Sequence, residues 1–432
     1  VRVLYDFKTN RLVCAWLPDG TVSGDNAINA DVMVIREHQE DARMITFDNS
    51  SSKLSGVKTV YGAMKFNRWT LNNKSSESGH AVLDPSHQKS VYERALYFIS
   101  FPFDVNLGEV FGFGTYGVHW IIEYYDGLTR AKNGYWIDSP PNWKYVMSPK
   151  GYTLEANRGY ILCLDLDLMK DDNEEFWPHG IETVELFFPS SSSLETIKQT
   201  NCTIPALSSE YQCTINRGTG TEGDRRVKDS YWRCLGVPSF ANYTTELSNG
   251  TSTITWQPTG NTLPFLYAWN MTDNTLTPQN TSTWAFKTMH AYLAQCPTQI
   301  IWSATSGPSS IVARRENEMP ITEYEWRLEL AQDSQMVDQA YIRMSNLEQV
   351  TDTFDFGQDL SKEFNATRSN IYSFIGYEKA AANSMPLKTE QTTIVALGLN
   401  IITAGEYTLG MPDGTDGVGV TLVDSETGTR TN

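Results

Sequence analysis

The densest group of carboxylates in the sequence lies on a predicted strand and on the loop that follows it. Asp165 and Asp167 share one face of the strand expected over Gly159–Leu168, and Asp171 and Asp172 follow in an acidic loop. Clustered carboxylate oxygens can bind Ca²⁺, although the EF-hand pattern D-x-[DN]-x-[DN]-G is not met. The sequence therefore predicts a calcium site at these four residues, and the alternative is a solvated acidic loop in an acidic protein.

A second group combines flat aromatic rings with polar groups. Tyr125, Asp126, Trp136 and Trp143 lie close together in the sequence, and Trp136 and Trp143 belong to a loop-like stretch that contains two prolines. Aromatic faces stack on sugar rings while carboxylates and amides bond the sugar hydroxyls. The pattern predicts a glycan-binding platform with Trp136 and Trp143 as its exposed rings. The alternative is that these aromatics belong to the core, as alternating aromatics in β-rich chains usually do.

Other signatures of catalysis or cofactor binding are missing from the sequence. The segments 112–117 and 218–223 match G-x-G-x-x-G, but neither leads from a strand into a helix, as a dinucleotide site requires. The six histidines form no H-E-x-x-H pair, and no G-x-S-x-G elbow is present. We therefore predict no catalytic residues, no organic cofactor and no enzyme activity.

The six cysteines show no metal or redox spacing. None of them forms a C-x-x-C pair, which disfavours zinc and thioredoxin-type sites. Cys202 and Cys213 flank a short excursion rich in Ser, Thr and Pro, and a disulfide between them would close it in an oxidising compartment. Thiols are the alternative, because spacing alone does not determine pairing.

The overall composition limits the classes of partner. The chain has 432 residues and a formal net charge of −17, so it would repel the phosphates of a nucleic acid. Its longest apolar stretches are too short to span a bilayer as a helix. Aromatic residues make up 12 % of the chain, and such residues favour strands over helices. We expect neither a nucleic-acid partner nor a membrane-spanning segment.

Strand-like patterns separated by turns recur along the whole chain. In the clearest one, Tyr324, Trp326, Leu328 and Leu330 alternate with charged residues, as in a sheet with one buried face and one wet face. The predicted fold class is all-β, with tandem antiparallel β-sandwich modules and few helices. We place the modules at 1–74 (alone or as the end of a larger upstream domain), 81–200, 225–316 and 320–432.

The two middle modules repeat each other loosely. Three segments of the first module have counterparts in the same order in the second: Ser100–Phe103, Tyr124–Gly127 and Gly159–Leu162 correspond to Gly236–Ser239, Tyr267–Asn270 and His290–Leu293. Such self-similarity predicts duplicated β-modules. The last module is expected to be truncated, because Thr427–Thr429 has the form of a hairpin turn that lacks its return strand.

Five segments together resemble a family of surface proteins. They are Ser100–Asp104, Trp232–Pro238, Phe354–Lys362, Ala382–Leu387 and Gly405–Thr408. They are similar to segments of the large secreted and cell-surface proteins of Bacteroidetes-type bacteria, of the kind exported by the type IX route. The resemblance covers about Tyr92 to the end, and it implies tandem β-sandwiches displayed at the bacterial cell surface. It implies little about activity, because such modules occur in adhesins, enzymes and structural proteins alike.

These observations favour a non-enzymatic surface module of the adhesin type. Rigid sandwiches would present loops to a glycan, or to a protein of a host or neighbouring cell, and would adjoin further domains of a longer chain. Two alternatives stay open. One is the accessory region of a secreted hydrolase, and the other is a spacer or subunit of a surface layer or filament, which exposed edge strands would favour.

Overall fold

The computed structural model describes the following residues: 2–6, 11–15, 32–36, 59–67, 94–112, 114–134, 142–165, 183–190, 201–215, 225–237, 254–259, 264–270, 275–281, 286, 289–306, 323–365, 368–388, 392–412 and 419–431.

Strands predominate in these residues, and the predicted all-β fold class is confirmed. The strands pair antiparallel except for two pairs, β3 with β4 and β21 with β24. The helices of the described residues are short: α2 (Gly127–Asn133), α4 (Arg225–Lys228) and the 3-10 helices η2 (Leu107–Glu109) and η3 (Ser209–Tyr211). No helix in this part of the chain has the length and apolar composition needed to cross a membrane.

The first sandwich consists of two four-stranded sheets, in the orders β3-β4-β12-β7 and β5-β11-β8-β9, with a small β6-β10 pair beside them. Large side chains such as Phe101, Tyr160 and Phe188 fill the space between the sheets and are fully buried. The strands are β3 (Val32–Arg36), β4 (Thr59–Asn67), β5 (Arg94–Ser100), β6 (Val105–Asn106), β7 (Phe111–Gly112), β8 (Trp120–Tyr125), β9 (Trp143–Tyr145), β10 (Thr153–Leu154), β11 (Gly159–Asp165) and β12 (Thr183–Pro189). A separate antiparallel pair, β1 (Arg2–Asp6) and β2 (Arg11–Ala15), precedes them.

The second sandwich repeats this arrangement. Its sheets have the orders β13-β19-β15 and β14-β18-β16-β17, and Trp302 and Phe286 are buried between them. The strands are β13 (Asn201–Ile204), β14 (Trp232–Gly236), β15 (Ile254–Thr259), β16 (Phe265–Asn270), β17 (Thr275–Asn280), β18 (Ala291–Gln295) and β19 (Ile300–Ser306). In chain order β13 to β19 correspond to β4, β5, β7, β8, β9, β11 and β12, so the topology agrees with the repeat predicted from the sequence.

The two inner sheets pack face to face through a shared apolar layer. Leu96 and Phe98 of β5 point into this layer, whereas Tyr97 and Ile99 point into the core of the first sandwich. Alternation along a strand sends neighbouring side chains to opposite faces, so the inner strands bury both faces. The result is a stack of four β-layers, in which Phe98 stacks on Trp269 of β16 at 5.0 Å between ring centroids.

An approximate two-fold symmetry relates the two sandwiches where they meet. The N–H of Ser100, at the end of β5, donates to the carbonyl of Met289 at 3.0 Å, and the N–H of Gly236, at the end of β14, donates to that of Asn157 at 2.8 Å. Asn157 and Met289 each precede the equivalent strand by two residues, and both have left-handed backbone with φ of 63° and 66°. The same local structure is therefore used twice, as in an isologous dimer interface.

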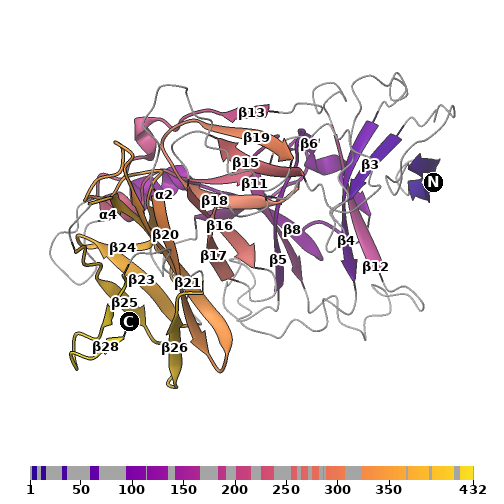
Figure 1. The fold of residues 1–432 in the computed structure, drawn as a ribbon. Helices are drawn as coiled ribbons and strands as arrows, with labels where there is room; N and C mark the ends of the chain where they lie inside the picture. Colours follow the sequence, from indigo (N-terminus) through magenta and orange to yellow (C-terminus); the bar gives the residue numbers. More distant parts are fainter. Residues whose placement is uncertain are drawn as a thin grey trace.

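The C-terminal sheet lies against this stack at one end of the molecule, and β3, β4 and β12 lie at the other (Figure 1). Its order is β25-β23-β24-β21-β20-β26, with β22 paired to β24, and Trp326, Leu330 and Ile371 are among its buried apolar residues. The strands are β20 (Glu323–Gln332), β21 (Gln335–Ser345), β22 (Leu360–Ser361), β23 (Asn370–Ile375), β24 (Glu378–Pro386), β25 (Leu397–Asn400) and β26 (Tyr407–Gly410).

The structure bears on two expectations about the ends of the modules. The turn at Thr427–Thr429 does have a return strand, because β28 (Arg430–Thr431) pairs with β27 (Leu422–Val423) around it. The expectation of an unpaired turn was therefore wrong, since two residues after the turn suffice to form the ladder. β4, from the predicted module 1–74, pairs along its length with β12 of the predicted module 81–200. The division into four modules stays a prediction.

Candidate functional site

The carboxylate predicted to contact a glycan, that of Asp126, caps the start of α2. The Asp126 carboxylate accepts the N–H of Thr129 at 2.9 Å and its hydroxyl at 2.7 Å, and it also binds the ammonium of Lys144. An acidic N-cap satisfies otherwise unbonded amides at a helix start. Burial would raise the pKa of Asp126, but the hydrogen bonds from Lys144 and Thr129 outweigh it and lower this pKa.

The predicted aromatic residues of the platform pack on one another. The rings of Tyr125 and Trp143 meet edge to face with centroids 4.8 Å apart, and Trp143 meets Phe98 in the same way at 5.3 Å. Tyr125 is buried and Trp143 is half-buried against the layer between the inner sheets. The structure thus brings Tyr125, Asp126 and Trp143 together, with the rings turned toward the core. Trp136 lies outside the described residues, so its role as an exposed ring stays a prediction.

The predicted calcium site falls almost wholly outside the described residues. Asp165 ends β11, opposite Arg94 of β5 in the register, and nothing is described of its side chain. Asp167, Asp171 and Asp172 lie outside the described residues, so the calcium site stays a prediction.

The predicted Cys202–Cys213 disulfide is not formed in this structure. Cys202 is a half-buried thiol on β13, where it packs against the core of the second sandwich, and burial raises its pKa. Cys213 is buried after η3, and its backbone N–H donates to the Ser230 hydroxyl at 2.8 Å. Pairing in an oxidising compartment stays a prediction.

A buried guanidinium joins three parts of the molecule that are far apart in the sequence. Arg130 of α2 donates to Asp229 before β14 at 3.2 Å and to Glu363 after β22 at 2.5 Å. It also donates to the Tyr125 hydroxyl at 2.9 Å, and it lies over the Trp232 ring at 4.4 Å from the centroid. We call these five residues the junction network.

The charged side chains of the junction network pair with one another in the interior. The side chains of Arg130 and Asp229 are 3 % and 0 % exposed. Burial would lower the pKa of Arg130, but the charges of Glu363, Tyr125 and Asp229 outweigh it and hold this pKa well above its usual value. Asp229 Oδ2 has no hydrogen-bond partner among the described residues, and its Oδ1 accepts from Arg130. The network therefore fixes the first sandwich, the second sandwich and the C-terminal sheet together.

Further hydrogen bonds dock the C-terminal sheet on the second sandwich. The Tyr267 hydroxyl donates to the Ser361 carbonyl and accepts the N–H of Glu363, both at 2.9 Å. Gln295 accepts the N–H of Ser361 at 3.0 Å. Because these groups are buried, the loss of any one bond would leave a polar atom in the interior without a hydrogen-bond partner.

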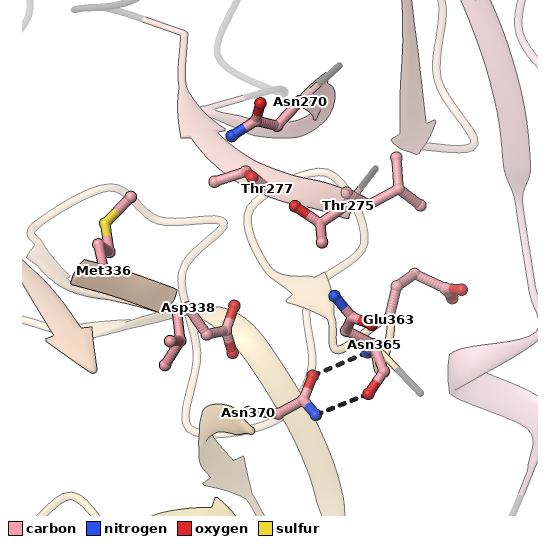
Figure 2. A pocket seen from close by; sticks show the side chains of 10 residues that line it. Asn270, Thr275, Thr277, Met336, Asp338, Glu363, Asn365 and Asn370 are labelled. Atoms are coloured by element: carbon pink, nitrogen blue, oxygen red, sulfur yellow. Dashed lines mark hydrogen bonds between the residues drawn. The ribbon is translucent and has the colours of Figure 1, made fainter. Parts of the chain in front are cut away.

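A polar pocket opens beside the junction network, between β17 and the C-terminal sheet (Figure 2). The space that its walls enclose is small, about 20 Å³, which is room for about one water molecule. We call it the junction pocket. Its lining residues are Asn270, Thr275, Leu276, Thr277, Met336, Val337, Asp338, Glu363, Asn365 and Asn370.

Two side chains of the junction pocket are fixed by their own bonds. Asn370 accepts the N–H of Asn365 at 2.8 Å and donates to the carbonyls of Asn365 and Arg368. Asp338 binds the Lys362 ammonium and accepts the N–H of Ile371 at 2.7 Å, both through Oδ2. The wall of the pocket is therefore preorganised, which lowers the cost of ordering it around a ligand.

A separate buried carboxyl lies in the loop before β22. Asp359 accepts the N–H groups of Asp355 and Ser384, each at 2.6 Å, and is 2 % exposed. Burial raises its pKa to about 8, against the opposing effect of these two hydrogen bonds. A carboxyl with a shifted pKa marks a functional site in some proteins and a structural hydrogen bond in others. Here both carboxyl oxygens of Asp359 accept backbone N–H groups, which indicates a structural role.

Sequence reasoning did not find the junction network or the junction pocket. Arg130 lies 99 residues from Asp229 and 233 residues from Glu363, so no local pattern unites them. No protein-family model matches the chain, and no curated protein or solved structure matches it significantly.

Proposed function

We propose that this chain is a non-enzymatic, extracellular module of a cell-surface protein, which holds a binding surface rigidly and presents it to a glycan or a protein. The junction network is the observation that carries the proposal. Three units that could move independently are tied by buried, mutually dependent charges, and inter-unit motion is otherwise the default expectation. A body of this kind suits the display of a fixed surface.

The ion pairs of the carboxylates at the junction also support binding rather than proton transfer. Asp338 is held by Lys362, and Glu363 is held by Arg130. A general acid or base must be free to exchange a proton with its substrate, whereas Asp338 and Glu363 are engaged with cationic side chains of the chain itself. These side chains are suited to orienting a ligand.

The test is a binding screen of the purified chain against a glycan array and immobilised matrix proteins, with calcium and with a chelator. We expect a saturable ligand, and we expect the two sandwiches and the C-terminal sheet to unfold in one calorimetric transition. Separate transitions together with a blank screen would refute the proposal. Loss of binding with the chelator would support the calcium site predicted at Asp165, Asp167, Asp171 and Asp172.

A second candidate function, a spacer that self-associates, is favoured by one edge of the C-terminal sheet. β25 is an edge strand, and Leu399, Ile401 and Ile402 along this segment are 49 %, 44 % and 45 % exposed. Exposed apolar edge strands pair readily with other strands. Sedimentation velocity over a range of concentrations distinguishes the two, because a spacer of this kind associates and a monomeric display module does not.

A further inference from the structure

A lysine and an aspartate are buried against each other between two strands of the C-terminal sheet. The Lys362 ammonium, directly after β22, donates to Oδ2 of Asp338 on β21 at 2.5 Å. The two side chains are only 1 % and 10 % exposed. The pair formed by Lys388 and Asp352 is different, because its side chains are 42 % and 68 % exposed. Of these two pairs, only the first is removed from solvent.

The Lys362 ammonium has few partners for its hydrogens. An ammonium group carries three N–H donors, and among the described residues Asp338 alone bonds it. Desolvation makes a buried ion pair costly unless further hydrogen bonds support it. The passage of one proton from the ammonium to the carboxylate replaces the ion pair with a neutral amine and a neutral carboxylic acid. A neutral lysine amine is a nucleophile, and in this place it lies against a carboxyl group.

The Asp338 carboxyl is held in a way that suits attack by an amine. The backbone N–H of Ile371 donates to Oδ2 at 2.7 Å. A donor at this oxygen stabilises the negative charge that develops on it when a nucleophile adds to the carboxyl carbon. Because burial fixes both reacting groups in contact, the reaction does not have to wait for an encounter.

The other carboxyl oxygen faces a space of the right size for a leaving water molecule. Oδ1 of Asp338 has no hydrogen bond to the described residues. Asp338 lines the junction pocket, and in Figure 2 its carboxylate points into that space. The pocket encloses about 20 Å³, which is room for about one water molecule.

From this geometry we propose that Lys362 and Asp338 join in an intramolecular amide, an isopeptide bond. The Nζ–Cγ bond forms and the Cγ–Oδ1 bond breaks. Oδ1 leaves as water with two of the three ammonium protons, and the third stays on the amide nitrogen. Oδ2 remains as the amide carbonyl oxygen and keeps its bond from the Ile371 N–H. No electrons are exchanged with another molecule, so the step needs neither an oxidant nor a co-reactant.

The cross-link fixes the segment that docks on the second sandwich. Lys362 lies between Ser361 and Glu363, and both of these residues bond to the Tyr267 hydroxyl. An isopeptide bond to β21 ties this segment covalently to the sheet, and it also restricts the unfolded chain. The inference goes beyond the proposed function and does not depend on it, because the cross-link involves no ligand.

Mass spectrometry of the purified, folded full chain tests the bond. The intact mass should be lower than the mass of the sequence by one water molecule. A tryptic digest should contain a branched peptide that joins Asp338 to Lys362, because trypsin does not cut after a lysine whose Nζ is an amide. The exposed Lys388–Asp352 pair is the internal control in the same digest and should give linear peptides only.

The variant Lys362→Arg separates the isopeptide bond from other losses of water. It keeps a positive charge, but a guanidinium is not deprotonated in proteins and does not attack the carboxyl. Cyclisation at an aspartate–glycine step, such as Asp413–Gly414, also removes one water molecule, but it does not need Lys362. Lys362→Arg should therefore have the full mass of its sequence and no branched peptide.

We expect the branched peptide in most molecules of the parent chain and in none of the variant. Linear peptides with unmodified Lys362 and Asp338 from the folded parent chain would overturn the proposal and leave an ordinary buried ion pair. A loss of water that persists in Lys362→Arg, without a branched peptide in the parent chain, would overturn it as well. The peptide map of the parent chain decides the matter even if the variant fails to fold.

Discussion

Replacing Arg130 with Met removes the cation of the junction network while keeping a long side chain against Trp232. Asp229 and Glu363 would then lie in the interior without their common partner. Removing one member of a buried ion pair costs about 3–5 kcal/mol, because the remaining charge is stranded. Asp229 is fully buried and its Oδ2 atom already lacks a partner among the described residues, so we expect a loss of about 4 kcal/mol.

The assay is unfolding in guanidinium chloride, followed by tryptophan fluorescence. With a denaturant slope of about 5 kcal/mol per molar, the midpoint should fall by roughly 0.8 M. Lys132→Met is the matched control, because Lys132 lies on the same helix with an exposed side chain. This control should leave the midpoint within about 0.1 M of the parent value.

The double variant Arg130→Met/Asp229→Asn tests whether the two charges depend on each other. With the Asp229 charge removed, less charge is stranded, so the double variant should lose clearly less stability than the sum of the two single variants. Strict additivity would show that the charges are independent. An Arg130→Met midpoint equal to that of Lys132→Met would refute the reasoning that the network holds the units together.

Three further predictions concern other parts of the structure. Alanine normally stabilises a helix relative to glycine, but a Cβ at Gly127 would lie 2.0 Å from the Trp232 carbonyl oxygen. Gly127→Ala should therefore lower the free energy of unfolding by about 3 kcal/mol, measured by denaturant titration. A stabilised variant would contradict this packing. Ser100→Ala removes the bond from the Ser100 hydroxyl to the His290 carbonyl at 2.6 Å, and calorimetry should record a loss of about 1–3 kcal/mol; an unchanged midpoint would show that the bond is dispensable. Burial raises the pKa of Asp359 to about 8, so the folded chain keeps a proton there that the unfolded chain loses near pH 4. The free energy of unfolding should therefore fall as pH rises from about 4 to 8. Asp359→Asn should flatten this slope in denaturant titrations over that range.

Strand content could be predicted from the sequence because its signal is local. The alternation of Tyr324, Trp326, Leu328 and Leu330 with charged residues corresponds to β20, where Trp326, Leu328 and Leu330 are buried and Tyr324 is half-buried. The repeat was also visible, because similar segments at corresponding strands follow one another in the same order. These features depend on neighbours within a few residues of one another.

The arrangement of layers could not be predicted in the same way. All five residues of β14 are buried, because this strand lies in an inner sheet with a neighbouring sheet on each face. A strand buried on both sides loses the polar–apolar alternation that reveals orientation. For the same reason the rings of Tyr125 and Trp143 gave no indication from sequence alone of whether they faced solvent or the layer between the inner sheets.

The junction lies where the two repeated sandwiches differ from each other. In the first sandwich, residues 126–142 connect β8 to β9 and include α2, whereas residues 271–274 suffice between the equivalent strands β16 and β17. The longer connection carries Arg130, which reaches the second sandwich and the C-terminal sheet. The junction pocket opens at Thr275–Thr277, at the start of β17. The repeated strand order thus accounts for the stack, and the longer connection of the first sandwich accounts for the network that fixes the third unit.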